Sequence, residues 1–288
     1  MRFAAIARHR TIWPLRWLCQ ALLVTPGGFY AWLKRPESER AGMDRQLTAA
    51  IHISFADSDR TYGAWRVRRD LRAWGHRCGV HRVQRLMSAA RLVARPKRRR
   101  VPSDAGVRPE QAIAPNLLDR QFGAMAPNCK WAADFTYLWT EQGWLYVAVV
   151  LDLFSRRVVG WSMSAQMSAQ LVTDAMLMAI WRRGPKQALL HYSDQGSQYT
   201  SEQFQKLLIN HGVTCSMSRS GNCWDNAAME SFFSTLKTER TNRTAYQTRD
   251  QAKADVFTYI EQFYNLRRRH STLDYMTPAE YEQAAGMC

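Results

Sequence analysis

The chain has 288 residues, 46% of them apolar, and a formal net charge of +16 at pH 7. This is enough apolar material for two or three folded units. Six cysteines occur without a CxxC pair, which excludes a disulfide framework and favours a reduced, cytoplasmic protein. The apolar stretch at residues 13–24 is interrupted by Pro14, Arg16 and Gln20, which excludes a membrane span or a cleaved signal.

The positive charge is concentrated at the start of the chain. Residues 1–102 hold 22 Lys and Arg against 6 Asp and Glu, whereas residues 103–288 hold 18 of each. Because each neutralised phosphate releases counterions, such a segment favours a polyanionic partner such as DNA. A merely solubilising surface is the alternative, but nearly all of the charge is arginine, which suits phosphate geometry better than lysine.

The first two predicted segments are helical. Residues 1–43 give a short helical opening segment with an aromatic cluster that we interpret as core. Residues 44–95 form the next unit, with predicted helices at about 45–56, 64–74 and 80–92. Arginines lie between the apolar positions of the last two helices, which fits a helix-turn-helix-like DNA-binding domain. An ordinary helical spacer with a solvated basic face is the alternative, and the candidate DNA contacts are Arg82 and Arg85.

A linker is predicted over residues 96–127. It opens on a cationic run that includes Arg98 and Arg99 and continues through a passage containing Pro, Ala and Gly. These two arginines are candidate clamps for backbone phosphates, although runs of this kind are more often mobile than docked.

An α/β domain is predicted over residues 128–240. Short polar turns separate the first three of its strands, and helices alternate with strands thereafter. The expected elements are strands at 130–139, 144–152 and 158–163, a helix at 169–182, a strand ending before 194, a helix at 201–211 and a strand at 213–217. This order predicts a mixed sheet with helices on both faces.

Three acidic residues stand out in this domain. Asp134 lies in a predicted inner strand, Asp194 follows an apolar run, and Glu230 lies on a helix with a core-facing stripe. Lys237, two helical turns after Glu230, projects from the same flank. Alone, each acid is usually a turn, cap or solvated residue. Together the acids indicate a site for Mg²⁺ or Mn²⁺, and two such ions would suit in-line displacement at phosphorus.

The sequence around these acids carries a family resemblance. It rests on YSDQGSQYTS, SRSGNCWDNAAMESFFSTLK and LDLFSRRVVGWSMS. These motifs closely resemble the core of DDE transposases, specifically the second-reading-frame protein of the bacterial insertion sequence 3 family, which resemble retroviral integrases. The match is dense from about Trp131 to Tyr281. It implies a ribonuclease-H-like fold and gives Asp134, Asp194 and Glu230 the places of the catalytic triad.

The resemblance also implies DNA contacts. In the family, the loop before the helix of the triad glutamate lies close to the DNA end, which makes Asn222 and Trp224 candidates; a capping turn is the alternative. Lys237 resembles the family's basic residue seven positions after the glutamate and is expected to contact a phosphate. Asp152 is the one nearby acid that rivals the first triad aspartate, but LDLFSRR resembles a structural strand and turn of the family.

Both ends of the chain resemble the same family. Residues 44–95 carry patterns similar to its YGxxRV and RVxRLM, with Arg91 where the family often has glycine. Residues 241–288 are predicted to be a C-terminal helical extension. They read YNLRRRHSTLDYMTP where the family has YNxxRxHSxLGYxxP, with Asp274 in place of glycine. We expect the arginines there, including Arg268, to face DNA; a purely structural closing helix is the alternative.

The resemblance implies a DNA transposase that cleaves transposon ends and joins them to double-stranded target DNA. It also implies a homo-oligomer on DNA in the bacterial nucleoid, with no membrane partner. The sequence contains no sustained apolar heptad that could pair two transposon ends. The resemblance implies that an upstream-frame DNA-binding protein serves this purpose as a fusion or partner. The alternatives are a ribonuclease-H-like metal nuclease that only hydrolyses nucleic acid and a non-catalytic DNA-binding regulator.

Overall fold

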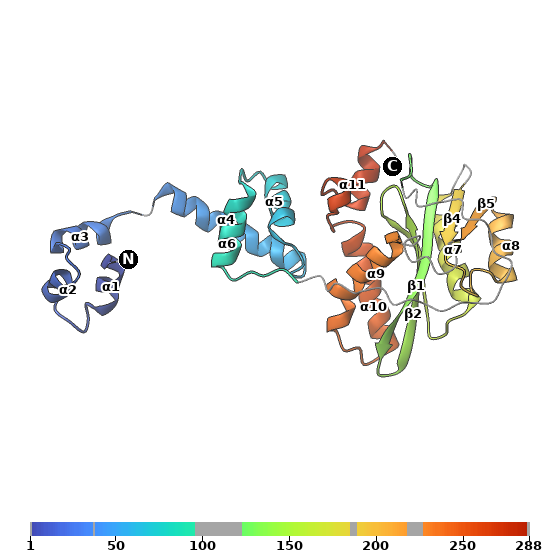
Figure 1. The fold of residues 1–288 in the computed structure, drawn as a ribbon, viewed down its shortest axis with the longest axis horizontal. Helices are drawn as coiled ribbons and strands as arrows, with labels where there is room; N and C mark the ends of the chain where they lie inside the picture. Colours follow the sequence, from blue (N-terminus) through green and yellow to red (C-terminus); the bar gives the residue numbers. More distant parts are fainter. Residues whose placement is uncertain (1, 37, 96–122, 185–188, 218–226, 287–288) are drawn as a thin grey trace. The chain divides into compact units, whose positions relative to one another are not determined.

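The chain folds as two compact units, Met1–His52 and Ile53–Cys288 (Figure 1). Helix α4 (Glu39–Asp57) contains the residues at which the division falls. Among the described residues no helix is both long and apolar enough to cross a membrane. The computed structural model describes residues 2–36, 38–95, 123–184, 189–217 and 227–286.

The first unit buries a small core of its own. Its helices before α4 are α1 (Arg2–His9), α2 (Leu15–Ala21) and α3 (Pro26–Lys34). Ile6, Cys19 and Phe29 are buried together, one from each helix. The Thr25 hydroxyl accepts a hydrogen bond from the Gly28 N–H at 3.1 Å and so caps α3. The aromatic cluster is therefore only partly core, since Tyr30 remains 51% exposed.

The second unit begins with the end of α4 and two further helices, α5 (Ala64–Ala73) and α6 (Val80–Ala89). Val67 and Leu71 of α5 are buried, as their spacing predicts. Trp74, expected on the same face, is 46% exposed because α5 ends just before it. Helix α6 stops short of the predicted end near residue 92. Arg91 adopts a φ of 55°, the left-handed conformation that favours glycine.

A five-stranded mixed sheet forms the centre of this unit, in the order β3-β2-β1-β4-β5. The first three strands are antiparallel neighbours, and β4 and β5 add to β1 in parallel. This confirms the mixed sheet predicted from the order of elements. The strands are β1 (Lys130–Thr140), β2 (Gly143–Asp152), β3 (Val158–Ser164), β4 (Leu189–Ser193) and β5 (Val213–Met217).

Helices cover both faces of the sheet (Figure 1). Alternate residues of β2 contribute to the two cores. Val150 packs with α7 (Ala169–Arg183) and α8 (Glu202–Asn210), and Val149 packs with α9 (Ala227–Glu239) and α10 (Arg249–Thr258). Gly160 of β3 lets α7 approach closely, because a Cβ there would lie 2.7 Å from the backbone nitrogen of Ala179. The α9 face is the one that concerns the site.

The chain after the sheet is helical to its end. Asp274, in the position where the family pattern has glycine, has a φ of 50°, a conformation that Asp tolerates better than most residues. Thr277 and Glu280 form a capping box at the start of the last helix. The elements are α9 (Ala227–Glu239), a 3₁₀ turn (Thr241–Arg243), α10 (Arg249–Thr258), a π-helix (Tyr259–Tyr264), a second 3₁₀ turn (Ser271–Leu273) and α11 (Pro278–Ala284).

Candidate active site and nucleic-acid interface

The two aspartates come from neighbouring parallel strands. Strands β1 and β4 pair with Ala132 opposite Tyr192. Two residues further along each strand direction stand Asp134, inside β1, and Asp194, directly after β4. Parallel pairing in this register therefore brings the two carboxylates to the same level of the sheet.

Each aspartate is held by a backbone N–H close to it in sequence. Oδ1 of Asp134 accepts a hydrogen bond from the Phe135 N–H at 2.7 Å. Oδ1 of Asp194 accepts one from the Gly196 N–H at 2.9 Å. A Cβ at Gly196 would lie 2.9 Å from this same oxygen, so a larger residue would displace the carboxylate. These contacts fix the orientation of both side chains without neutralising them.

Glu230 and Lys237 project from one flank of α9. Helix α9 packs on the sheet through Met229, Phe232 and other buried apolar residues, which leaves Glu230 exposed in its first turn. The ammonium of Lys237 lies 5.2 Å from the ring centroid of Tyr137 on β1. The charged flank of α9 therefore faces the strand that carries Asp134.

The pKa of Asp134 records this arrangement. Burial raises it from 3.8 to about 8, with Asp194 and then Glu230 adding to the rise, while the Phe135 N–H and Lys237 act in the opposite direction. Burial also raises the pKa of Glu230. Three acids and one lysine from three separate elements thus share one electrostatic environment.

A tyrosine that sequence reasoning missed lies beneath the aspartates. Tyr199 is 1% exposed, and its hydroxyl has no hydrogen-bond partner within the described parts of the chain. Burial raises its pKa, and the charges of Asp134 and Asp194 raise it further, so the phenol stays neutral. It packs against Phe204 of α8 with ring centroids 5.4 Å apart. In the sequence, the polar run QGSQYT gives no sign that this residue turns inward.

The carboxylates have the chemistry of a divalent-cation site. Oxygen ligands are those that Mg²⁺ and Mn²⁺ prefer. Burial is the main cause of the raised pKa of Asp134, and a cation would relieve the repulsion from Asp194 and Glu230 that adds to it. Among the described residues no group of three His, Cys, Asp or Glu side chains is already arranged around one point as a ligand set. The residues fit such an ion in type and charge, and Glu230 would have to approach the two aspartates to share it.

The rival acid Asp152 has a structural role. It is fully buried, and its Oδ1 accepts hydrogen bonds from the N–H groups of Phe154 and Ser155 at 2.8 and 3.2 Å. Its Oδ2 accepts from the Asn128 N–H at 2.6 Å and from the Trp131 indole at 3.2 Å. This carboxylate therefore fixes the turn after β2, in agreement with the sequence interpretation.

The predicted DNA contacts differ in their exposure to solvent, and several lie outside the described residues. On α6, Arg85 is exposed and Arg82 partly buried. Arg268 is 5% exposed, and its guanidinium donates to both oxygens of Glu239 at 2.8 Å, which contradicts the expectation that it faces DNA. The other four predicted contacts lie outside the described residues: Asn222, Trp224, Arg98 and Arg99.

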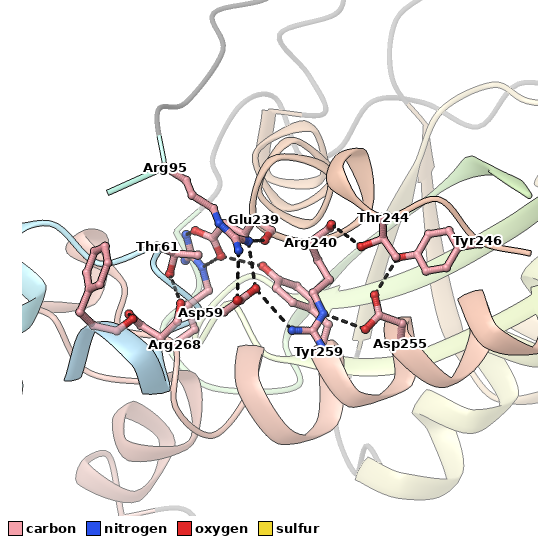
Figure 2. A network of polar contacts seen from close by, with 12 residues as sticks. Asp59, Thr61, Arg95, Glu239, Arg240, Thr244, Tyr246, Asp255, Tyr259 and Arg268 are labelled. Carbon is pink, nitrogen blue, oxygen red and sulfur yellow. Dashed lines mark hydrogen bonds and ion pairs between the residues drawn. The ribbon is translucent and has the colours of Figure 1, made fainter. Parts of the chain in front are cut away.

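The Glu239–Arg268 pair belongs to a polar network that joins the α5–α6 segment to α9 and the C-terminal helices (Figure 2). The Tyr259 hydroxyl also donates to Glu239, at 2.9 Å. Nearby, Arg95 forms an ion pair with Asp59 at 2.9 Å. A separate link runs from the Tyr62 hydroxyl, which donates to the Arg267 carbonyl at 2.8 Å. These contacts hold the helix-turn-helix-like segment from residue 53 onward against the catalytic domain.

Comparison with protein families defines the class. The family described as integrase core domain matches residues 124–223, and a second family of the same description matches residues 211–278. The HTH-like domain family matches residues 43–100. The sheet and its acids thus form an integrase core, preceded by a helix-turn-helix-like segment.

Individual relatives define the family. The transposase InsF for insertion sequence IS3A of Escherichia coli (strain K12) is 38% identical over 284 residues, which are 98% of each chain. The insertion element IS600 uncharacterized 31 kDa protein of Shigella sonnei is 36% identical and covers 92% of this chain and 97% of its own. The chain belongs to the insertion sequence 3 family of transposases, as its motifs predict, and is a DDE-type enzyme of DNA transposition.

Solved structures with a similar fold include the HTLV-2 integrase catalytic core domain in complex with magnesium. In its trimeric form it is 18% identical, with a TM-score of 0.44, and covers 55% of this chain and 99% of its own. The simian T-cell lymphotropic virus intasome in complex with the PP2A regulatory subunit B56 gamma is 16% identical, with a TM-score of 0.46, and covers 71% of this chain and 67% of that chain.

Proposed function

We propose that Asp134, Asp194 and Glu230 are the catalytic residues with which this chain cleaves transposon ends and joins them to target DNA. The observation that best supports this is the coupling of the three acids, since Asp194 and Glu230 both raise the pKa of Asp134. A cluster of carboxylates that costs electrostatic energy in the metal-free protein is characteristic of functional sites. The four hydrogen bonds of Asp152 provide the contrast of a structural acid.

The proposed reaction has two displacement steps at phosphorus. A water oxygen attacks the phosphodiester at the transposon end, and the bond to the 3′ oxygen breaks, which frees a 3′ hydroxyl. That hydroxyl then attacks a phosphodiester of the target and displaces a second 3′ oxygen, so no covalent protein intermediate forms. Asp134, Asp194 and Glu230 would hold divalent ions, which when bound activate the attacking oxygen and stabilise the leaving one. Two ions are proposed because a pair serves both oxygens.

Other residues of the site prepare the substrate. The ammonium of Lys237 offers a counter-charge for a phosphate near the scissile bond. The buried ring of Tyr199 lies close enough to the aspartates for their charges to act on it and adds an apolar group to their surroundings. We further propose that Arg82 and Arg85 contact backbone phosphates from α6 and that the chain acts on double-stranded DNA as an oligomer.

The test is a set of isosteric substitutions. Asp134→Asn, Asp194→Asn and Glu230→Gln should each reduce cleavage and joining to background in Mg²⁺ while DNA binding is retained, because each removes a charged ligand without changing shape. Glu202→Gln is the matched control, since Glu202 is 81% exposed on α8 and forms an ion pair with Lys206. Near-normal activity of any triad variant would show that the metal site is elsewhere. Cleavage without joined products would identify a nuclease instead.

A further inference from the structure

A cavity of about 240 Å³ opens beside α9 in the second unit. Its lining comes from α5, the turn after β2, α9 and the segment that follows the π-helix. Among the lining residues that the structure describes there is no acidic side chain. Three arginines and one histidine are among its lining residues: Arg66, Arg156, Arg268 and His270.

The arginines of this cavity outnumber the carboxylates that pair with them. Glu239 bonds Arg268 at 2.8 Å and lies 3.7 Å from Nη1 of Arg66, so one carboxylate serves two guanidinium groups. The guanidinium of Arg156 makes neither an ion pair nor a hydrogen bond with any residue in the described part of the chain. Burial lowers the pKa of Arg156, which shows that this cation is held partly out of water. The cavity therefore carries a surplus of positive charge.

The pKa of His270 responds to the same excess of positive charge. Burial lowers its pKa to about 2, and Arg268, Arg66 and Arg156 all lower it further. The imidazole therefore stays neutral, with Nε2 3.3 Å from Nη1 of Arg268. A neutral ring at this place adds a polar contact to the cavity without adding charge.

The backbone at Arg156 is held in an uncommon conformation. Its φ is 60°, in the left-handed region that is unfavourable for a non-glycine residue, and its N–H donates to the Asp152 carbonyl at 2.8 Å. The buried Asp152 carboxylate fixes this turn by the four hydrogen bonds described above. Strain of this kind is often kept where a side chain must be presented to a ligand.

We propose that this cavity binds a phosphate of the DNA backbone, with Arg156 as its main ligand-binding residue and Arg66 beside it. Arg268, which is bound to Glu239, adds positive charge to the cavity without contacting the DNA. Arginine suits this task, because its planar fork donates two parallel hydrogen bonds to a phosphate. The proposal rests on the proposed function, since it takes the phosphate from the DNA that the triad acts on.

The composition of the cavity favours DNA over free phosphate, because the helix-turn-helix-like segment contributes to its lining. Arg66 comes from α5 of that segment, and Ala227 and Ser231 come from the first turns of α9. Because successive residues of a helix are rotated by about 100°, Ser231 lies on a different side of α9 from Glu230 and Lys237. A phosphate in the cavity would therefore belong to DNA that passes a different side of α9 from the reacting bond.

Two measurements on the full chain test this proposal, both without divalent metal so that no cleavage occurs. The first is the salt dependence of binding to a DNA duplex, and the second is thermal stabilisation by inorganic phosphate, with chloride at equal ionic strength as reference. The variants are Arg156→Gln and Arg156→Lys. The control is Lys206→Gln, which removes one charge from an exposed residue of α8 on the other face of the sheet.

Arg156→Gln should lower the slope of log K against log salt by about one unit and abolish the phosphate-induced rise in melting temperature, with Lys206→Gln unchanged in both. Arg156→Lys should keep the slope but reduce the stabilisation by phosphate, because it keeps the charge and loses the fork. If Arg156→Gln loses the stabilisation by phosphate but keeps the salt slope of DNA binding, the cavity binds free phosphate and not DNA. If Arg156→Gln and Lys206→Gln lower that slope equally, the effect is one of general charge. Either result overturns the proposal. Cleavage by the unmodified chain in Mg²⁺ is scored separately, so failure of the cavity and failure of the transposase chemistry are distinguishable.

Discussion

The protonation of Asp134 is expected to differ between the metal-free and metal-bound forms of the proposed site. Its pKa of about 8 lies above the 3.8 of an unperturbed aspartate, so its proton is retained in the folded, metal-free chain near neutral pH. Because the folded pKa is the higher one, the stability that this group contributes is lost as pH rises from about 4 towards 8. A divalent cation binds the ionised form and therefore releases that proton.

We expect the rise in melting temperature caused by Mg²⁺ to increase from pH 6.5 to pH 8.5, since fewer Asp134 carboxyls then need to be deprotonated. Thermal unfolding with and without Mg²⁺ across this range measures it. Asp134→Asn is the control, in which the pH dependence of the increment should disappear. A metal-induced increment that is constant over this range in the unmodified chain would contradict the assignment of Asp134 as a ligand.

Two buried histidines act in the opposite pH direction. Burial lowers the pKa of His191 to about 3, and burial together with Arg268, Arg66 and Arg156 lowers that of His270 to about 2. Because the unfolded chain takes up these protons near pH 6.5 and the folded chain does not, stability is complete above that pH and is lost as pH falls below it. Each histidine should cost about 1.4 kcal/mol of unfolding free energy per pH unit below about 6.

His191→Phe isolates one of these two contributions. The ring lies among Tyr199 and Phe204, at centroid distances of 6.1 and 5.2 Å, so a phenyl group fits the same surroundings. Denaturant unfolding at pH 6.5 and pH 5 should show a smaller loss of unfolding free energy on acidification in the variant, by roughly 1.6 kcal/mol over this interval. An equal acid loss in both proteins would mean that His191 is protonated in the folded chain.

At the scale of elements, α9 connects the proposed site to the polar network. Glu230 lies in its first turn, and its last residue is Glu239, which bonds Arg268 and Tyr259. The buried ion pair therefore fixes the C-terminal end of the helix that carries a triad residue. Removing one member of such a pair leaves an uncompensated buried charge, which is far more costly than removing both.

Glu239→Gln should lower the unfolding free energy by about 3–5 kcal/mol, because it leaves Arg268 charged and buried without a counter-ion. Adding Arg268→Met should recover most of this loss, since an apolar pair of similar size avoids the desolvation cost. Urea unfolding of both single variants and the double variant gives the coupling energy. A double variant as unstable as the sum of the two single variants would show that the pair is not coupled.

At the scale of the whole molecule, the sequence predicts elements better than side-chain environments. Strand β5 has the predicted bounds, and β1 ends one residue beyond the predicted end, because apolar stripes and polar turns are local signals. Arg268 was expected to face DNA, because the run from 267 to 269 looks uniformly cationic. Its partner Glu239 lies 29 residues earlier in the chain, and nothing local identifies such a pairing.

In the candidate site, too, residues within sequence motifs are easier to predict than residues whose role depends on burial. The three acids could be proposed from the sequence because their motifs carry the family resemblance, and their assignment as the triad stays a prediction. The parallel pairing of β1 and β4 is consistent with the order of elements. Tyr199 and Arg156 were not, because their importance depends on burial and on charges that come from distant segments. Sequence periodicity does not distinguish an arginine in a cavity from one in solvent.

The distribution of charge over the whole chain leads to a prediction about specificity. Arginines commonly contact phosphates, and phosphate contacts position a protein on DNA but do not read bases. We expect the chain alone to bind DNA tightly with little sequence preference, and specific recognition of the transposon ends to require the upstream-frame partner supplied as a fusion.

A competition assay between terminal-repeat and scrambled duplexes at physiological salt measures the preference. The expected ratio for this chain is below roughly a thousandfold, the lower range for specific binders, and should rise above it in the fusion. A larger ratio from the chain alone would show that α5 and α6 read bases directly and that no partner is needed for recognition.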